Sequence, residues 1–137
     1  MKSGTFYAQG VALTVSGLTR VLDGATFSFN STIGTKIFND ITVDAGGIFT
    51  SSVVPSFIVN GNMLNNGTAT IPGTGVVGGT FTLQGAEKTI GGSNPWILRG
   101  AVSVTNLLGY TNEGTLLTNT LIGGGKFTNG TNAILEL

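Results

Sequence analysis

The sequence predicts an all-β protein whose strands coil into a parallel β-helix, a β-solenoid of about six or seven coils. Three observations favour this fold. No ten-residue segment free of Gly and Pro places apolar residues at helical spacing. Apolar and polar residues instead alternate over many short segments, as they do in half-buried strands. A corner rich in Asn, Gly and Thr also recurs after an apolar stretch, at residues 65–68, 112–115 and 128–131.

The recurring corner predicts where one strand ends and the next begins. Asn and Gly tolerate the left-handed backbone that a sharp corner needs, and Thr favours the extended strand that follows. Looser versions of the corner occur at residues 23–26 and 45–48. Gly47 and Gly67 are 20 residues apart, a spacing typical of the coils of a solenoid.

The alternation locates the strands in chain order. In residues 41–44, Ile41 and Val43 share the face predicted to point inward. The same pattern recurs in residues 80–84, 102–105 and 133–137. Residues 57–59 and 63–64 are denser in apolar side chains and are predicted to be buried on both sides.

The length predicts one solenoid domain over residues 1–137. Residues 1–37 are less regular and are a candidate capping coil. The step from Gly85 to Gly114 is 29 residues, which predicts an insertion near residues 91–99. The alternative fold is an antiparallel β-sandwich or jelly roll, which also combines short strands with Gly-rich turns. The repeated chemistry of the corner favours the solenoid.

The composition argues against several classes of function. Only 9% of residues are charged, the net charge is zero, and 40% are hydrophobic, so nothing favours nucleic acid or an anionic membrane as partner. The chain lacks Cys and His, which removes disulfides and the common transition-metal ligands. No apolar stretch approaches the ~18 residues of a membrane-spanning helix. We therefore expect no cofactor and no membrane insertion.

Two motifs resemble ligand sites but have a structural explanation. Asp40 and Asp44 are four residues apart and could form a carboxylate pair, yet a solvated outer face with corner capping explains them as well. Residues 123–126 resemble a phosphate loop but have Thr120 and Phe127 where that motif needs Gly and Ser or Thr, so we expect a corner.

Trp96 is the single tryptophan and lies in the predicted insertion, close to Arg99. A protruding aromatic could stack on a sugar ring or fill a partner's pocket, which makes both residues candidate binding residues. The alternative is that Trp96 covers the core where a coil is interrupted. Thr-x-Thr triplets at residues 68–70, 80–82 and 118–120 would favour an ice-binding surface if they shared one face.

Residues 39–50, 59–68, 81–92 and 123–135 resemble repeat segments of large secreted adhesin-like β-solenoid surface proteins of gliding and biofilm-forming bacteria. The resemblance covers roughly residues 38–137. It implies a parallel β-helix, an extracellular or cell-surface location, and a structural or adhesive role. It carries over no catalytic residues.

The sequence therefore predicts a non-enzymatic structural module. Residues 132–137 form a strand without a visible cap, and an uncovered edge can pair with another chain. We expect Ile134, Leu135 and Leu137 to take part in head-to-tail association into a homo-oligomer, fibre or stalk. The alternative is a binding module for glycans, through Trp96, or for ice, through threonines.

Overall fold

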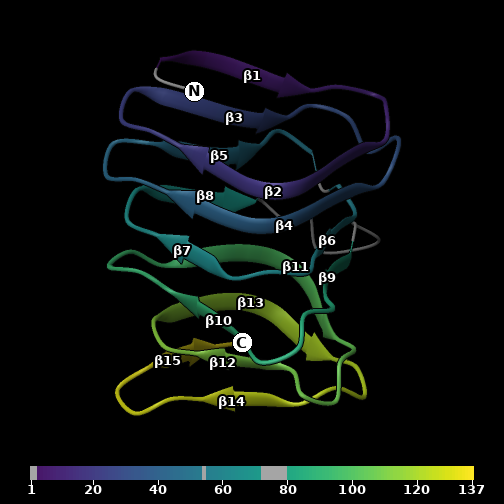
Figure 1. The fold of residues 1–137 in the computed structure, drawn as a ribbon, viewed down its shortest axis with the longest axis vertical. Helices are drawn as coiled ribbons and strands as arrows, with labels where there is room; N and C mark the ends of the chain where they lie inside the picture. Colours follow the sequence, from purple (N-terminus) through teal and green to yellow (C-terminus); the bar gives the residue numbers. More distant parts are fainter. Residues whose placement is uncertain (1–2, 54, 72–79) are drawn as a thin grey trace.

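The computed structural model describes residues 3–53, 55–71 and 80–137, which form an all-β fold without helices (Figure 1). The described strands are β1 (Gly4–Ala8), β2 (Leu13–Val21), β3 (Ala25–Phe29), β4 (Lys36–Val43), β5 (Ile48–Ser51), β6 (Phe57–Val59), β7 (Met63–Asn65), β8 (Thr68–Ile71), β9 (Thr80–Leu83), β10 (Lys88–Gly91), β11 (Trp96–Val104), β12 (Tyr110–Asn112), β13 (Thr115–Ile122), β14 (Phe127–Asn129) and β15 (Ile134–Glu136). Successive strands turn around a common axis, and each coil lies beside the previous one.

The coils have three faces, named here in the order in which the chain crosses them. The first face contains β1, β3, β5, β8, the first part of β11, the first part of β13, and β15. The second contains the first parts of β2 and β4, then β6, β9, and the second parts of β11 and β13. The third contains the second parts of β2 and β4, then β7, β10, β12 and β14.

Every strand pair in the described residues is parallel, which confirms the solenoid and rules out the antiparallel sandwich or jelly roll. Six coils are followed by β15, which begins a further turn on the first face. The predicted number of coils is therefore confirmed. Parallel pairing arises because each coil crosses a given face in the same direction.

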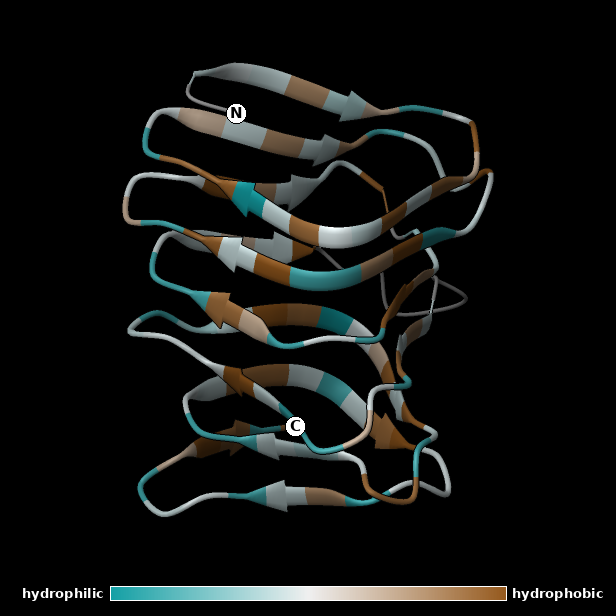
Figure 2. Cartoon of the chain, in the orientation of Figure 1, coloured by the Kyte–Doolittle hydropathy of each residue, from teal (hydrophilic) through white to brown (hydrophobic). Residues whose placement is uncertain are grey.

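The core consists of columns of inward side chains, one from each coil. On the first face one column runs through Phe6, Phe27, Phe49, Ala69, Trp96, Leu116 and Leu135. The predicted alternation is confirmed, since Ile41, Val43, Phe81 and Leu83 are all at most 1% exposed. Figure 2 shows apolar and polar residues alternating along the strands. Alternation thus packs one side of each strand into the interior and leaves the other side outside.

Aromatic rings fill the N-terminal half of this core. Phe27 stacks on Phe49 with ring centroids 5.4 Å apart, and Phe49 meets Trp96 edge to face at 6.0 Å. Phe29 and Phe57 stack at 6.0 Å. Such offset and edge-to-face pairs add about 0.5–1.5 kcal/mol each beyond the burial of area. The aromatic cluster therefore holds successive coils together through side chains as well as backbone ladders.

The corners require glycine for two different reasons. Gly46 has a φ of 80°, so the predicted left-handed backbone is correct at this early corner. No residue of the corners at 65–68 and 112–115 has a positive φ, so the prediction is wrong there. A Cβ on Gly67 would instead lie 2.3 Å from Asp44 O and 2.4 Å from Gly47 O. Gly67 is therefore needed because two successive corners approach each other closely.

The corner asparagines are buried hydrogen-bonding groups. Asn65 and Asn112 are both 0% exposed. Asn65 Oδ1 accepts a hydrogen bond from Gly67 N at 3.0 Å, and its Nδ2 donates to Pro95 O at 2.7 Å. Asn112 Nδ2 donates to Ile134 O at 2.9 Å. Each side chain therefore closes its own corner or ties it to the next coil.

Residues 4–37 contain β1 and β2, which pair with the coil that follows, with one register shift between Val15 and Leu18. Two other predictions about the fold are wrong. Residues 57–59 and 63–64 are not buried on both sides, since Ile58 is half-buried and Leu64 is 42% exposed. Both side chains point away from the core, which lies on one side of each strand.

The insertion predicted near residues 91–99 is also misplaced. Residues 92–95 form a corner between β10 and β11 that has the same length as the corner 44–47 between β4 and β5. The long register step is from Ala69 to Trp96, and the extra length includes the segment between the end of β8 at Ile71 and the start of β9 at Thr80. That segment, residues 72–79, lies outside the described residues. The spacing misled because Gly85 belongs to a different corner, between the second and third faces.

Candidate functional surfaces

Trp96 does not protrude, so the interpretation of this residue as a sugar-stacking aromatic is wrong. The side chain is 0% exposed and packs in the first-face column between Ala69 and Leu116. Its Nε1 is one of two buried side-chain polar atoms without a hydrogen-bond partner in the described residues. Arg99 is half-buried at the bend of β11, where the register with β13 shifts. The two residues therefore do not form a common site.

The N-terminal end of the solenoid leaves its core columns uncovered. Strands β1 and β2 each pair on one side only, with β3 and β4. Phe6 points inward yet is 43% exposed, whereas Phe27 below it is 8% exposed. Leu13 and Val15 also point inward and are only partly buried. This end therefore combines an unpaired backbone edge with exposed apolar side chains.

The C-terminal end has the complementary arrangement. Strands β14 and β15 each pair on one side only, with β12 and β13. Leu121, Phe127 and Leu135 point toward the core and are partly buried. Of the other predicted interface residues, Ile134 is 55% exposed and points outward, and Leu137 is 69% exposed. Leu135 is therefore the predicted residue that lies directly under the core.

The two ends terminate the same columns of side chains. The first-face column begins at Phe6 and ends at Leu135. The second-face column begins at Leu13 and ends at Leu121. The strands at both ends run in the same direction. Among the described residues the first face carries seven strands and each of the other two faces carries six, because β15 adds a strand to the first face alone.

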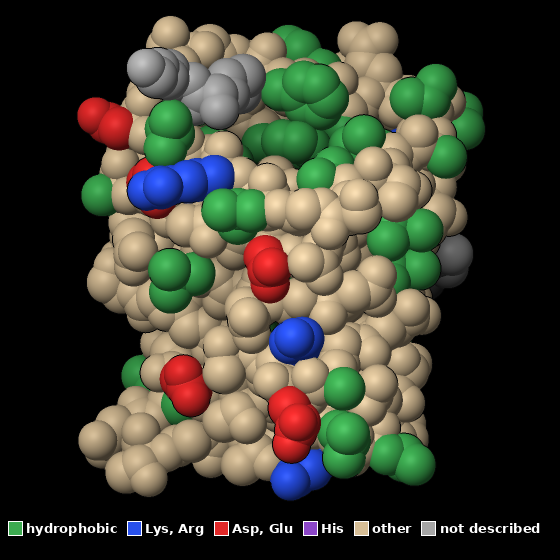
Figure 3. Space-filling model, in the orientation of Figure 1, with side chains coloured by type: hydrophobic (Ala, Val, Ile, Leu, Met, Phe, Trp, Pro, Cys, Tyr) green, Lys and Arg blue, Asp and Glu red, His purple; other side chains and the backbone are tan. Residues whose placement is uncertain are grey.

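The third face carries most of the charge. Figure 3 shows Lys, Arg, Asp and Glu side chains scattered over this face. Of the eleven charged residues in the described part of the chain, eight lie in or beside strands of this face. They are Arg20, Asp23, Asp40, Asp44, Glu87, Lys88, Glu113 and Lys126. One ion pair joins Arg20 Nε to Asp44 Oδ2 at 2.9 Å, with the Arg20 side chain 56% exposed. An exposed pair of this kind contributes about 0–1 kcal/mol.

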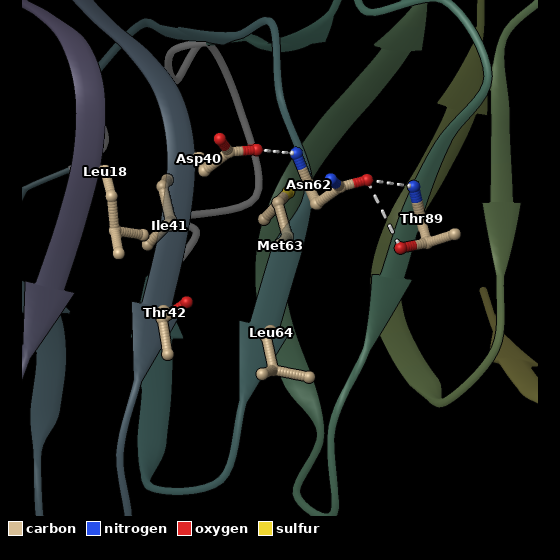
Figure 4. A pocket seen from close by; sticks show the side chains of 8 residues that line it. All are labelled: Leu18, Asp40, Ile41, Thr42, Asn62, Met63, Leu64 and Thr89. Atoms are coloured by element: carbon tan, nitrogen blue, oxygen red, sulfur yellow. Dashed lines mark hydrogen bonds between the residues drawn. The ribbon is translucent and has the colours of Figure 1, made fainter.

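A shallow depression of about 350 Å³ also lies on the third face (Figure 4). At one side of it, Asp40 Oδ1 accepts a hydrogen bond from Asn62 N at 2.7 Å. Asn62 Oδ1 in turn accepts hydrogen bonds from Thr89 N at 3.0 Å and Thr89 Oγ1 at 3.3 Å. These three polar residues hold one corner to the next. The apolar lining of the depression comes from Leu18, Ile41, Met63 and Leu64.

The acidic residues of the described part of the chain do not gather into one cluster. Within residues 3–53, 55–71 and 80–137, no group of three acidic, Cys or His side chains could hold a metal ion. Asp40 and Asp44 are used separately, one to cap Asn62 and the other to pair with Arg20. This arrangement agrees with the capping explanation of both residues.

Lys36 is an interior cation held by main-chain carbonyls. It is 0% exposed and occupies the second-face column between Leu13 and Phe57. Its Nζ donates to Val11 O at 2.5 Å and to Ile33 O and Gly34 O at 2.8 Å each. Burial lowers the pKa of Lys36 below its usual value. The residue therefore ties together the two loops that precede β2 and β4.

Tyr110 reaches from β12 across two coils. Its Oη donates to Val59 O at 2.9 Å and to Gly61 O at 3.0 Å. Burial raises the pKa of Tyr110 to about 12; a backbone hydrogen bond from Gly85 opposes this shift, and the negative charge of Asp40 adds to it. A Cβ on Gly85 would lie 2.8 Å from this hydroxyl, so the glycine leaves the space that it occupies.

The glycine-rich segment 123–126 has a structural role, and the Thr-x-Thr triplets lie on different parts of the solenoid. Gly125 N donates to Val104 O at 2.9 Å, and Lys126 is exposed, so residues 123–126 form a corner as expected. The Thr-x-Thr triplets do not share one face. Thr68 and Thr70 point outward on the first face, Thr82 points outward on the second, and Thr118 is 0% exposed inside the core.

No family model matches the chain, and comparisons with curated proteins and with solved structures also found no match. None of the described residues forms a helix long and apolar enough to cross a membrane.

Proposed function

We propose that the chain is a non-enzymatic structural or adhesive solenoid module that stacks head to tail with copies of itself. This proposal rests on one observation. Among the described residues, the strands at both ends pair on one side only, and they lie over the same core columns. In such a stack β15 of one copy pairs with β1 of the next, so that Leu135 lies against Phe6. Repetition of a contact between unlike ends produces an open filament when the rotation does not close a ring.

The stack is favoured by apolar burial and by backbone pairing. Full burial of one Leu or Phe side chain contributes about 1.5–3 kcal/mol, and Phe6 is still 43% exposed in the isolated chain. Each new contact also pairs the free edge of β1 with that of β15. No charged residue lies among the inward side chains Phe6, Leu13, Val15, Leu121 and Leu135, so no buried charge opposes the contact.

A filament of this kind has a mechanical role. Parallel backbone ladders run along its axis through every coil, and the second face adds uncharged side chains such as Thr82 and Ser103 to its outer surface. We place it outside the cell or at the cell surface because of its resemblance to adhesin-like repeats. The non-enzymatic part of the proposal is supported by Asp40 and Asp44, whose carboxylates are engaged by Asn62 N and Arg20.

The proposal is tested by measuring the assembly state of the purified chain across a range of concentrations. We expect light scattering after size-exclusion chromatography to show growing oligomers, and electron microscopy to show rods one solenoid wide. Leu135→Lys places a charge under the core column and should leave monomers. The matched control is Leu64→Lys, because Leu64 is 42% exposed on the third face, away from both ends. A strictly monomeric wild type at high concentration overturns the proposal.

The register of the stack has its own test. The chain contains no Cys, so Phe6→Cys and Leu135→Cys each introduce a single thiol. We expect a mixture of these two variants to form an intermolecular disulfide readily, because facing strands bring the two Cβ atoms within bonding range. Leu64→Cys mixed with Phe6→Cys is the control and should cross-link much less. Equal cross-linking in both mixtures would rule out this register.

A further inference from the structure

The outer surface of the first face differs from the rest of the molecule over its first four strands. Outward side chains of β1, β3, β5 and β8 form two ranks that follow the strand register. The first rank contains Thr5, Thr26, Ile48 and Thr68, and the second contains Tyr7, Ser28, Thr50 and Thr70. Seven of these eight side chains carry a hydroxyl group, and five of the seven are threonines.

This surface is uncharged. None of the residues of β1, β3, β5 and β8 is charged. The charged side chains gather instead on the third face, which is the face seen in Figure 3. Beyond β8 the hydroxyls of the second rank give way to Ile97 and Leu117, so the hydroxyl-bearing surface ends after four strands. A surface without ions holds no ionic hydration shell that a bound lattice of water would have to displace.

No hydroxyl of the two ranks hydrogen-bonds to a protein group in the part of the chain that the structure describes, and every rank residue except Ser28, which is 9% exposed, is exposed or half-buried. Among the described residues, the threonine hydroxyls that hydrogen-bond to protein groups are those of Thr89, Thr105, Thr118 and Thr120. None of these four lies in the ranks. Thr has few allowed rotamers because it is branched at Cβ, so each methyl and hydroxyl holds a defined position. The ranks therefore present ordered, unused hydrogen-bonding groups beside ordered methyl groups.

The spacing of the ranks is that of a sheet lattice. Neighbours within a rank are separated by about 4.7–4.9 Å, the distance between adjacent strands, and the two ranks are separated by about 6.6–6.8 Å, the length of two residues. The spacing within a rank lies close to a repeat of the oxygen lattice of hexagonal ice. Figure 1 shows these strands stacked one beside another with nearly the same direction.

We propose that this surface, the outer side of β1, β3, β5 and β8, binds ice. Ice is favoured over crystalline polysaccharide because a flat sugar surface is bound by aromatic side chains, and Tyr7 is the only aromatic residue in the two ranks. The second face has fewer hydroxyls, since its outer rank includes Ile37 and Ile58 beside Thr82. This inference goes beyond the structural role, and a filament would enlarge its effect by repeating the surface.

The test is ice-crystal shaping and thermal hysteresis of the purified chain. We expect the wild type to shape crystals and to open a measurable hysteresis gap. Thr50→Lys puts a charge in the centre of the second rank and should abolish both effects. Thr82→Lys is the matched control, because Thr82 is a half-buried outward threonine on a strand of the second face, and it should behave as the wild type.

Two further measurements keep the result decisive. Thermal unfolding shows whether each variant is folded, and Thr68→Lys, at an exposed position of the first rank, replaces Thr50→Lys if that variant does not fold. Round, unshaped crystals with wild-type protein overturn the proposal, as does an equal loss in Thr82→Lys. Binding to microcrystalline cellulose or chitin without ice shaping also overturns it. Leu135→Lys should keep ice shaping as a monomer, which separates this proposal from head-to-tail assembly.

Discussion

Replacement of Tyr110 by Phe removes one hydroxyl that joins β12 to a corner two coils away. The Oη of Tyr110 lies 2.9 Å from Val59 O and 3.0 Å from Gly61 O, and its single proton is shared between these two carbonyls. Val59 O also accepts a hydrogen bond from Gln84 N at 2.9 Å, so this carbonyl keeps a donor in the variant. Gly61 O has no other donor among the described residues, and Gly61 is buried. The variant therefore leaves one buried carbonyl without a partner.

The magnitude follows from that single loss. A buried acceptor that loses its donor costs about 1–3 kcal/mol, and the ring itself still fills the core. We expect Tyr110→Phe to lower the free energy of unfolding by about 1–2 kcal/mol at pH 7. For a urea m-value of about 2 kcal/mol/M, the midpoint should fall by roughly 0.5–1 M.

The pH dependence gives a second and independent signature. Tyr110 has a pKa of about 12 in the folded chain, against an ordinary tyrosine pKa of 10.0. Between these values the unfolded chain has lost the proton that the folded chain keeps, so stability falls as the pH rises. The contribution is complete below pH 10 and is lost by about pH 12, and two pKa units correspond to at most about 2–3 kcal/mol. Tyr110→Phe lacks this pH-dependent contribution to the free energy of unfolding.

The assay is urea unfolding at pH 7, 10 and 12, followed by circular dichroism. The difference between wild type and Tyr110→Phe isolates this hydroxyl, because all other titrating groups are common to both proteins. We expect the advantage of the wild type to shrink or reverse at pH 12. Tyr7→Phe is the matched control, since Tyr7 is 55% exposed, and should change stability by less than about 0.5 kcal/mol.

Two results would refute the reasoning. One is a Tyr110→Phe variant with the stability of the wild type at pH 7, which would mean that the hydroxyl contributes nothing. The other is a difference between the two proteins that stays constant from pH 10 to pH 12, which would mean that the hydroxyl is not buried.

Two substitutions test the interior cation and the corner glycine. Lys36→Met should lower the free energy of unfolding by about 1.5–3 kcal/mol in urea unfolding, because Met fills the column but gives no donor to the three carbonyls. An unchanged urea midpoint would contradict a stabilising role for the hydrogen bonds of Lys36. Gly67→Ala should cost about 1–3 kcal/mol, because its Cβ meets two backbone oxygens of the preceding corner. Gly17→Ala is the control for thermal unfolding, since nothing lies within 4 Å of the added Cβ; equal losses in both variants would show that close approach is not the cause.

The alternation of inward and outward side chains along a single strand is enough to predict the burial of some polar residues. Lys36 precedes Phe38 by two residues, so alternation already places both side chains on one face. Tyr110 and Asn112 stand in the same relation. Charge and polarity made these residues look like surface residues, whereas carbonyl partners at the corners make their burial tolerable.

The burial of Trp96 cannot be predicted from local alternation, because it depends on the length of the coil that precedes this residue. The glycine spacing treated Gly85 as part of the same series of corners as Gly67, although the two belong to different corners. Only the pairing of β11 with β8 and β13 shows that Trp96 continues a column of buried side chains. Similarly, no local pattern indicates that Gly67 is required by contact with the carbonyl of Asp44 rather than by its own φ.

The sequence by itself determined that the chain is all-β, that its strands alternate, and that Asn- and Gly-rich corners separate them. These features are local, since a period of two and a corner motif can be read within a few residues. Only the tertiary structure decided which side chains stack between coils, and with them the open columns at both ends and the hydroxyl ranks of the first face. The reason is that coil length varies along the chain, so stacking partners are fixed by contacts between coils and not by a constant spacing in the sequence.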